Sequence, residues 1–128
     1  MSETTILKSV LTGLKADADL MSLVSDVYET APDDAVAPYI TFSRLRLTDT
    51  STKTSQLFSI SMDLTIWDQS ASSRTVRQIL DRLRTVVPDL TADTGSFIGL
   101  SVRDTDLLRD KALNWQRSTV SIQGHYSP

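Results

Sequence analysis

Apolar and polar residues alternate most regularly between Leu57 and Asp68. Apolar side chains occupy every second position there, at Phe58, Ile60, Met62, Leu64 and Ile66. Because successive side chains of a strand point to opposite faces of a sheet, this period of two predicts a strand with one buried face and one polar face. Trp67 falls on the polar face, among serine, threonine and aspartate residues.

Four more segments have the β-branched and aromatic composition of strands. They are residues 27–28, 39–47, 97–108 and 113–126. Two prolines and the adjacent Asp33 and Asp34 predict a loop over residues 30–38. Asp110 and Lys111 are expected in the turn between the last two strands.

A first helical region covers residues 4–24, where apolar residues recur with helical spacing. The pattern allows one long helix or two short ones. We favour a bend within residues 13–19, because glycine lowers helix propensity and Asp17 or Asp19 can cap a new first turn.

A second helix follows the best strand. Its apolar stripe consists of Val76, Ile79, Leu80, Leu83 and Val87, and its outer face carries Arg74, Arg77, Arg82 and Arg84. Ser70, Ser72 or Ser73 can cap it, and Pro88 ends it. The arginines are either a solvated face offset by Asp81, which is the more ordinary interpretation, or a contact for DNA backbone or an acidic neighbour.

The order helix, strands, helix, strands predicts an α+β fold, with a mainly antiparallel sheet of about four or five strands and two helices packed on one face. At 128 residues, we expect residues 1–128 to form a single domain. There is no cysteine, so packing alone must hold the fold. The N-terminus resembles no signal peptide and no segment has the length of a membrane span, so we expect a protein made in the cytoplasm and no membrane partner.

Candidate chemistry is sparse. His125 is the single histidine and lies near the C-terminus, where a surface position is the better interpretation. Asp104, Asp106 and Asp110 lack the glycine and glutamate of a calcium loop, and the four glycines fit no phosphate-binding pattern. We therefore expect no enzyme activity, cofactor or metal. The net charge of −3 also disfavours a protein that reads DNA sequence.

Two features point instead to contacts with other proteins. Residues 48–56 contain no apolar side chain, so they have nothing to bury and should form a projecting hairpin connection. Trp67, and Trp115 on the last strand, are expected on exposed faces. A second interpretation of the tryptophans, a buried layer under the first helix, stays open.

The segment from Val27 to Phe42, VYETAPDDAVAPYITF, resembles the tail completion or tail terminator proteins of phages and gene transfer agents. Members are similar in opening with a helix that ends in a segment like residues 15–24. A short strand, a proline-containing loop and a strand that begins Pro-Tyr-Ile then follow. The resemblance continues through LTIWDQS, residues 64–70, and the helix RTVRQILDRLR, residues 74–84.

The resemblance implies a structural virion protein that forms a hexameric ring, which caps the head-proximal end of the tail tube and joins it to the head connector. The implied partners are other copies of the chain, the tail tube protein and a connector or stopper, with DNA only passing through the channel. Candidate contacts are Asp49, Thr50, Ser51, Thr52, Lys53, Thr54, Trp67, Arg74 and Arg77. Alternatives are another neck or tail component, such as a stopper or tube subunit, and an unrelated small-molecule-binding or enzyme domain.

Overall fold

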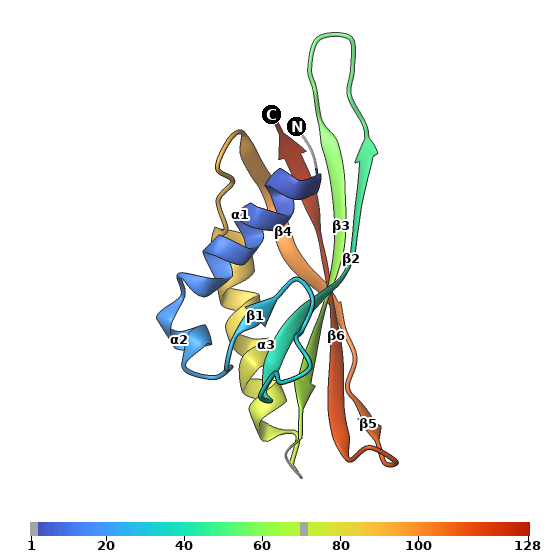
Figure 1. Cartoon of the computed structure of the whole chain (residues 1–128). Helices are drawn as coiled ribbons and strands as arrows, with labels where there is room; N and C mark the ends of the chain where they lie inside the picture. Colours follow the sequence, from blue (N-terminus) through green and yellow to red (C-terminus); the bar gives the residue numbers. More distant parts are fainter. Residues whose placement is uncertain (1–2, 70–71) are drawn as a thin grey trace.

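The computed structural model describes residues 3–69 and 72–128. Along these residues the helices are α1 (Glu3–Lys15), α2 (Ala18–Met21), α3 (Arg74–Val86) and the 3-10 turn η1 (Val87–Asp89). The strands are β1 (Val27–Tyr28), β2 (Tyr39–Asp49), β3 (Phe58–Asp68), β4 (Ser96–Thr105), β5 (Leu108–Asp110) and β6 (Trp115–Ser127). Figure 1 shows the helices together on one side of the twisted sheet.

The sheet has six strands in the order β1-β2-β3-β6-β4, and β5 pairs with β6 beyond the end of β4. All pairs are antiparallel except the parallel pair of β1 and β2. The centre is the pair of β3 and β6, which stays in register from Phe58 opposite Tyr126 to Asp68 opposite Gln116. This arrangement confirms the predicted α+β class and the mainly antiparallel sheet, with β5 as a short strand that the sequence pattern merged with β4.

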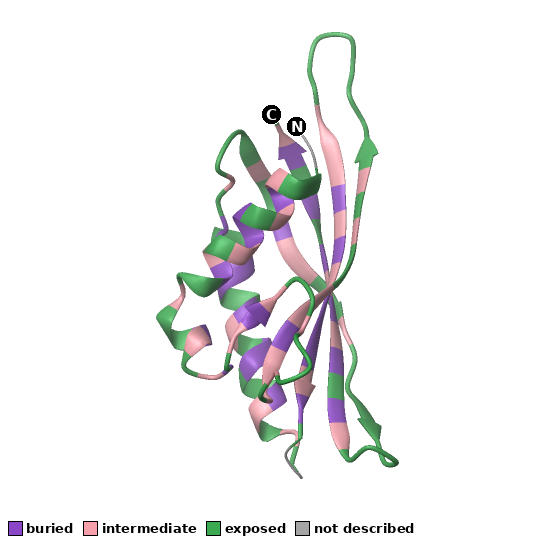
Figure 2. Ribbon diagram, in the orientation of Figure 1, coloured by how far each residue is buried: buried purple, intermediate pink, exposed green. Residues whose placement is uncertain are grey.

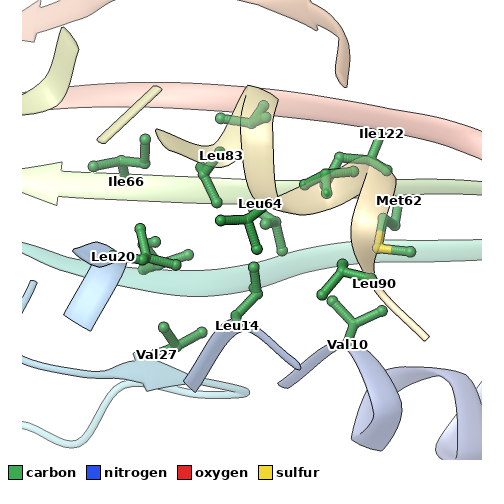
Figure 3. Packing of buried hydrophobic residues seen from close by; sticks show 14 of the residues in the cluster. Val10, Leu14, Leu20, Val27, Met62, Leu64, Ile66, Leu83, Leu90 and Ile122 are labelled. Carbon is green, nitrogen blue, oxygen red and sulfur yellow. The ribbon is translucent and has the colours of Figure 1, made fainter. Parts of the chain in front are cut away.

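The core lies between the sheet and the helices, as Figure 3 shows for part of it. The alternating residues of β3 behave as the pattern predicts, because Ile60, Met62, Leu64 and Ile66 are all buried in this core. Figure 2 shows the buried residues on the inner side of the helices and along the central strands, and exposed residues at the hairpin tips. None of the helices in the described residues covers the second face of the sheet (Figure 1).

The first helical region divides into two helices, as favoured from the sequence. The chain turns at residues 16–17, and Asp17 caps α2 by accepting a hydrogen bond from the Leu20 backbone N–H at 2.9 Å. Gly13 packs closely against Leu90, since a Cβ placed there would lie 2.5 Å from Leu90 Cδ2 and the end of that side chain would have to shift. Within the described residues, no helix is long and apolar enough to cross a bilayer.

Among the serines that could cap α3, the structure selects Ser72. Ser73 occupies the N-cap position but its side chain caps no backbone group, whereas the Ser72 Oγ accepts a hydrogen bond from the Arg74 N–H at 3.1 Å. Ser70, the third candidate cap, lies outside the described residues. At the other end, α3 stops at Val86, just before Pro88 as predicted, and the chain continues directly into the 3-10 turn η1, which contains Pro88.

Candidate assembly surfaces

The hairpin connection between β2 and β3 projects beyond the rest of the molecule (Figure 1). We call residues 48–56 the polar tip. All of them are exposed. Hydrogen bonds nevertheless order the tip, because the Thr50 N–H donates to the Leu57 carbonyl at 2.9 Å and the Thr52 N–H donates to the Ser55 carbonyl at 2.8 Å. The predicted hairpin connection between β2 and β3 is therefore confirmed, and its backbone is ordered by hydrogen bonds.

Asp49 and Ser51 close the base of the polar tip. The Asp49 carboxylate accepts a hydrogen bond from the Ser51 N–H at 2.8 Å, and hydrogen bonding by Ser51 lowers the pKa of Asp49. The Ser51 Oγ in turn accepts a hydrogen bond from the Leu57 N–H at 3.0 Å. Among the candidate residues, Asp49, Thr50 and Ser51 thus shape the tip, and Thr52, Lys53 and Thr54 lie at its far end.

Four aromatic rings gather on the helix-free face at the opposite end of the sheet. This aromatic cluster consists of Tyr28, Tyr39, Trp67 and Trp115. The centroid of the Trp67 ring lies 6.5 Å from that of Tyr39, in a stacked arrangement, and 6.1 Å from that of Trp115, edge to face. Trp67 Nε1 donates to Thr41 Oγ1 at 3.1 Å, and the Arg117 guanidinium lies 5.8 Å from the ring centroid.

The aromatic cluster decides between the two interpretations of the tryptophans. Trp67 follows Ile66, which is buried under the helices, so Trp67 points to the other face. Its ring and that of Trp115 are half-buried, mainly against each other and Tyr39. The interpretation as a buried layer under the first helix is therefore wrong, and the exposed-face interpretation holds in part.

A groove with a volume of about 560 Å³ lies over the aromatic cluster and the β5–β6 hairpin. Its lining includes the rings of Tyr39, Trp67 and Trp115, together with Leu108 and Leu113, whose exposed fractions are 50% and 67%. We call residues 107–114 the leucine tip. Sequence reasoning missed Tyr39, Leu108, Leu113 and Arg117 as parts of one surface, because strands far apart in the sequence bring them together.

The outer face of α3 divides into two functional parts. Arg82 donates to both carboxylate oxygens of Asp17, at 2.8 and 2.7 Å, so it joins α3 to α2. This hydrogen bonding is the largest cause of the lowered pKa of Asp17 and the raised pKa of Arg82. Arg84 contacts Asp81 at 3.4 Å. Arg84 therefore fits the interpretation of a solvated face offset by Asp81, whereas the pairing of Arg82 with Asp17 was not predicted.

Arg74 and Arg77 lie in the first turns of α3, both exposed. Arg77 Nε donates to Ser73 Oγ at 3.2 Å. Figure 1 shows this end of α3 at the same end of the molecule as the leucine tip. The structure thus brings Trp67, Arg74 and Arg77 to one end and Asp49 to Thr54 to the other.

Two of the three aspartates considered as metal ligands, Asp106 and Asp110, instead accept hydrogen bonds from backbone N–H groups near β5. Asp106 accepts a hydrogen bond from the Thr119 N–H at 2.7 Å, and Asp110 accepts hydrogen bonds from the Ala112 and Leu113 N–H groups at 3.0 and 3.2 Å. Among residues 3–69 and 72–128, no three side chains of the metal-ligating kinds stand together. His125 is exposed on β6.

The projecting polar tip and the half-exposed aromatic rings at the other end are surfaces available for contacts with other proteins. The chain belongs to the family described as tail completion protein gp17, whose model matches residues 8–126. It is a tail completion protein, a structural component of a phage-type tail.

A solved structure shows the same fold. A chain in the structure described as the virion of a native gene transfer agent (GTA) particle is similar, with 20% sequence identity and a TM-score of 0.84. The match covers 99% of this chain and 100% of that chain. No curated protein matches the sequence.

Proposed function

We propose that copies of this chain form a ring, hexameric as the family resemblance implies, that caps the head-proximal end of the tail tube and joins it to the head connector. The main support for this proposal is the position of the polar tip. It stands at one end of the long β2–β3 hairpin, while the aromatic cluster lies near the other end, so each subunit offers two different surfaces (Figure 1). A ring between two unlike neighbours needs such a pair of surfaces.

In this proposal the candidate residues divide between the surfaces. Asp49, Thr50, Ser51, Thr52, Lys53 and Thr54 form an axial or lumenal contact, and Trp67, Arg74 and Arg77 contribute to the opposite end. Residues 1–128 act as one domain, without catalysis and without a cofactor. The match to a chain of a gene transfer agent virion supports a place in such a particle or in a phage, where DNA passes through the channel.

The chain's acidic excess favours a channel that DNA crosses without binding. The net charge of −3 repels phosphate groups and so avoids contacts that would hold the DNA. A map of the electrostatic potential over the assembled ring should therefore show a negative or neutral lumen. A strongly positive lumen would contradict this part of the proposal.

The test of the ring is the mass of the purified protein by light scattering, alone and mixed with tail tube subunits, together with negative-stain images. We expect rings that sit on tube ends and limit tube length. Long filaments of the chain alone would identify a tube subunit instead. Particles that bind the head connector but leave tube length unchanged would identify a stopper.

A further inference from the structure

The groove over the aromatic cluster combines exposed apolar groups with positive charge. Leu108 and Leu113 are among the most exposed large hydrophobic residues of the described chain. Lys111 and Arg117 line the same groove. The carboxylate of Asp110, the acidic residue among the lining side chains, is occupied by the backbone of the turn. The groove is therefore suited to an acidic segment that carries an apolar side chain.

The leucine tip is ordered before any partner binds. The Asp110 carboxylate accepts hydrogen bonds from the N–H groups of Ala112 and Leu113. Asn114 adopts the left-handed conformation, with a φ of 55°, that reverses the chain direction. The Leu113 side chain is thus exposed by a shaped turn. Less conformational entropy is lost on binding when the contact is pre-organised in this way.

The chain itself contains a segment of matching chemistry, which we call the acidic loop (residues 32–36). Asp33 and Asp34 stand at the corner of a turn closed by the hydrogen bond from the Ala35 N–H to the Pro32 carbonyl at 3.1 Å. Val36 follows with an exposed fraction of 67%. The Ser25 hydroxyl donates to the Val36 carbonyl, so this loop is also pre-organised. The described residues form no ion pair with Asp33 or Asp34.

The acidic loop and the leucine tip lie on opposite edges of the sheet. The loop connects β1 to β2 at one edge, and β5 forms the other edge at this end. Tyr39, Trp67, Arg117 and Leu108 are successive neighbours across the strands. With strands about 4.8 Å apart, Leu108 lies on the order of 14 Å from Tyr39. Two complementary surfaces on opposite edges favour contact between successive copies, head to tail.

We propose that the groove of one copy receives the acidic loop of the neighbouring copy. Val36 packs against Leu113 and the Trp115 ring, and the Asp33 and Asp34 carboxylates pair with Lys111 and Arg117. The contact is heterologous, so it closes into a ring when the rotation between copies is a whole fraction of a turn. This inference rests on the proposed function, because it names the lateral contact of the proposed ring.

The absence of cysteine from the sequence allows a direct test by disulfide cross-linking. Val36→Cys and Leu113→Cys variants are purified separately, mixed with tail tube subunits and oxidised. We expect a disulfide-linked dimer on a non-reducing gel from the mixture, and none from either variant alone. The double variant should give a ladder that ends at the copy number of the ring. A mixture of Val36→Cys with Ile98→Cys is the matched control, since Ile98 is exposed on β4 away from the groove.

A charge exchange provides a second test. Asp34→Lys should weaken self-association, measured by analytical ultracentrifugation, roughly five- to tenfold, because it places like charges together. Adding Lys111→Asp should restore most of the loss. Both positions are exposed, so both variants should fold. Weakening by Asp34→Lys without restoration would contradict the pairing.

The outcomes separate this contact from the proposed function. Rings that cap tubes but give no Val36–Leu113 cross-link would overturn the contact and leave the function in place. Cross-linked oligomers that never limit tube length would support the contact and overturn the capping function. A chain that remains monomeric with tubes, and gives no cross-link, would overturn both.

Discussion

The two hairpin tips of this molecule differ in how much they need a partner. The polar tip contains no apolar side chain and closes on itself through hydrogen bonds of Asp49, Thr50, Ser51 and Leu57. The leucine tip is equally well shaped by Asp110 but leaves Leu108 and Leu113 half-exposed or more. Both are ordered, so order alone does not distinguish a solvent-exposed loop from a contact surface.

The difference lies in the cost of exposure. Apolar surface left in water forgoes about 25 cal/mol per Å², whereas hydroxyl groups are solvated well. Burial of the leucine tip against another protein is therefore favourable in itself, and binding by the polar tip depends on specific hydrogen bonds. We expect the leucine tip to supply affinity and the polar tip to supply selectivity.

The largest effect is expected from Trp67→Ala, which removes the ring that joins the aromatic cluster. Because this ring is half-buried, we expect a loss of about 2–3 kcal/mol in the free energy of unfolding, less than for a fully buried tryptophan. Urea denaturation measures it. Trp67→Phe, which keeps a ring but loses the hydrogen bond to Thr41, should cost about 1 kcal/mol. A loss below about 0.5 kcal/mol for Trp67→Ala would show that the cluster contributes little to folding.

A smaller effect, and one on assembly alone, is expected from Leu113→Asp. Leu113 is mostly exposed, so the free energy of unfolding should change by less than about 0.5 kcal/mol. Self-association should weaken at least about tenfold, because a charge replaces an apolar contact. Sedimentation and urea denaturation separate the two quantities. Thr52→Asp, the matched change at the polar tip, should leave self-association unchanged, and an equal loss there would remove the distinction between the tips.

The local features of the fold were predictable from the sequence, and the surfaces were not. The period of two in β3 and the cap at Asp17 depend on neighbouring residues, so the chain itself encodes them. By contrast, Arg82 binds Asp17, which lies 65 positions earlier in the sequence. No pattern along α3 distinguishes this paired arginine from the exposed Arg74 and Arg77. The interruption between β4 and β5 at residues 106–107 lies where the Asp106 carboxylate accepts a hydrogen bond from the Thr119 N–H of β6, a contact that the local sequence does not reveal.

The contact residues illustrate the same limit. The polar tip could be predicted because a run without apolar residues has nothing to bury. Trp67 could be singled out because it breaks the alternation of its strand. The sequence could not show that Tyr39 and Trp115 lie beside Trp67, since the three rings meet only through the register of three strands.

Shortening the polar tip should impair tail completion while leaving the chain folded. Replacing residues 50–57 by Asn-Gly joins Asp49 to Phe58, which are already paired, through a two-residue turn that suits a twisted hairpin. We expect the free energy of unfolding to change by less than about 1 kcal/mol and the self-association to persist. Tail completion, scored by infectious or DNA-transferring particles, should be lost. Normal particles made with this variant would show that the polar tip has no axial or lumenal role.

The smallest effect is expected from protonation of Asp49, which tests how far the polar tip is ordered by its own hydrogen bonds. Ser51 lowers the pKa of Asp49 in the folded chain, so the ionised form is the one the tip stabilises. That contribution is present above the unfolded pKa of about 3.9 and is lost as the pH falls through the lower folded value. The Ser51 amide resonance should therefore shift below about pH 4, while the Leu23 amide, which donates to the Leu20 backbone carbonyl far from the polar tip, serves as the internal reference. Asp49→Asn should abolish the titration at Ser51, and a Ser51 shift that persists in this variant would place its cause elsewhere in the hairpin.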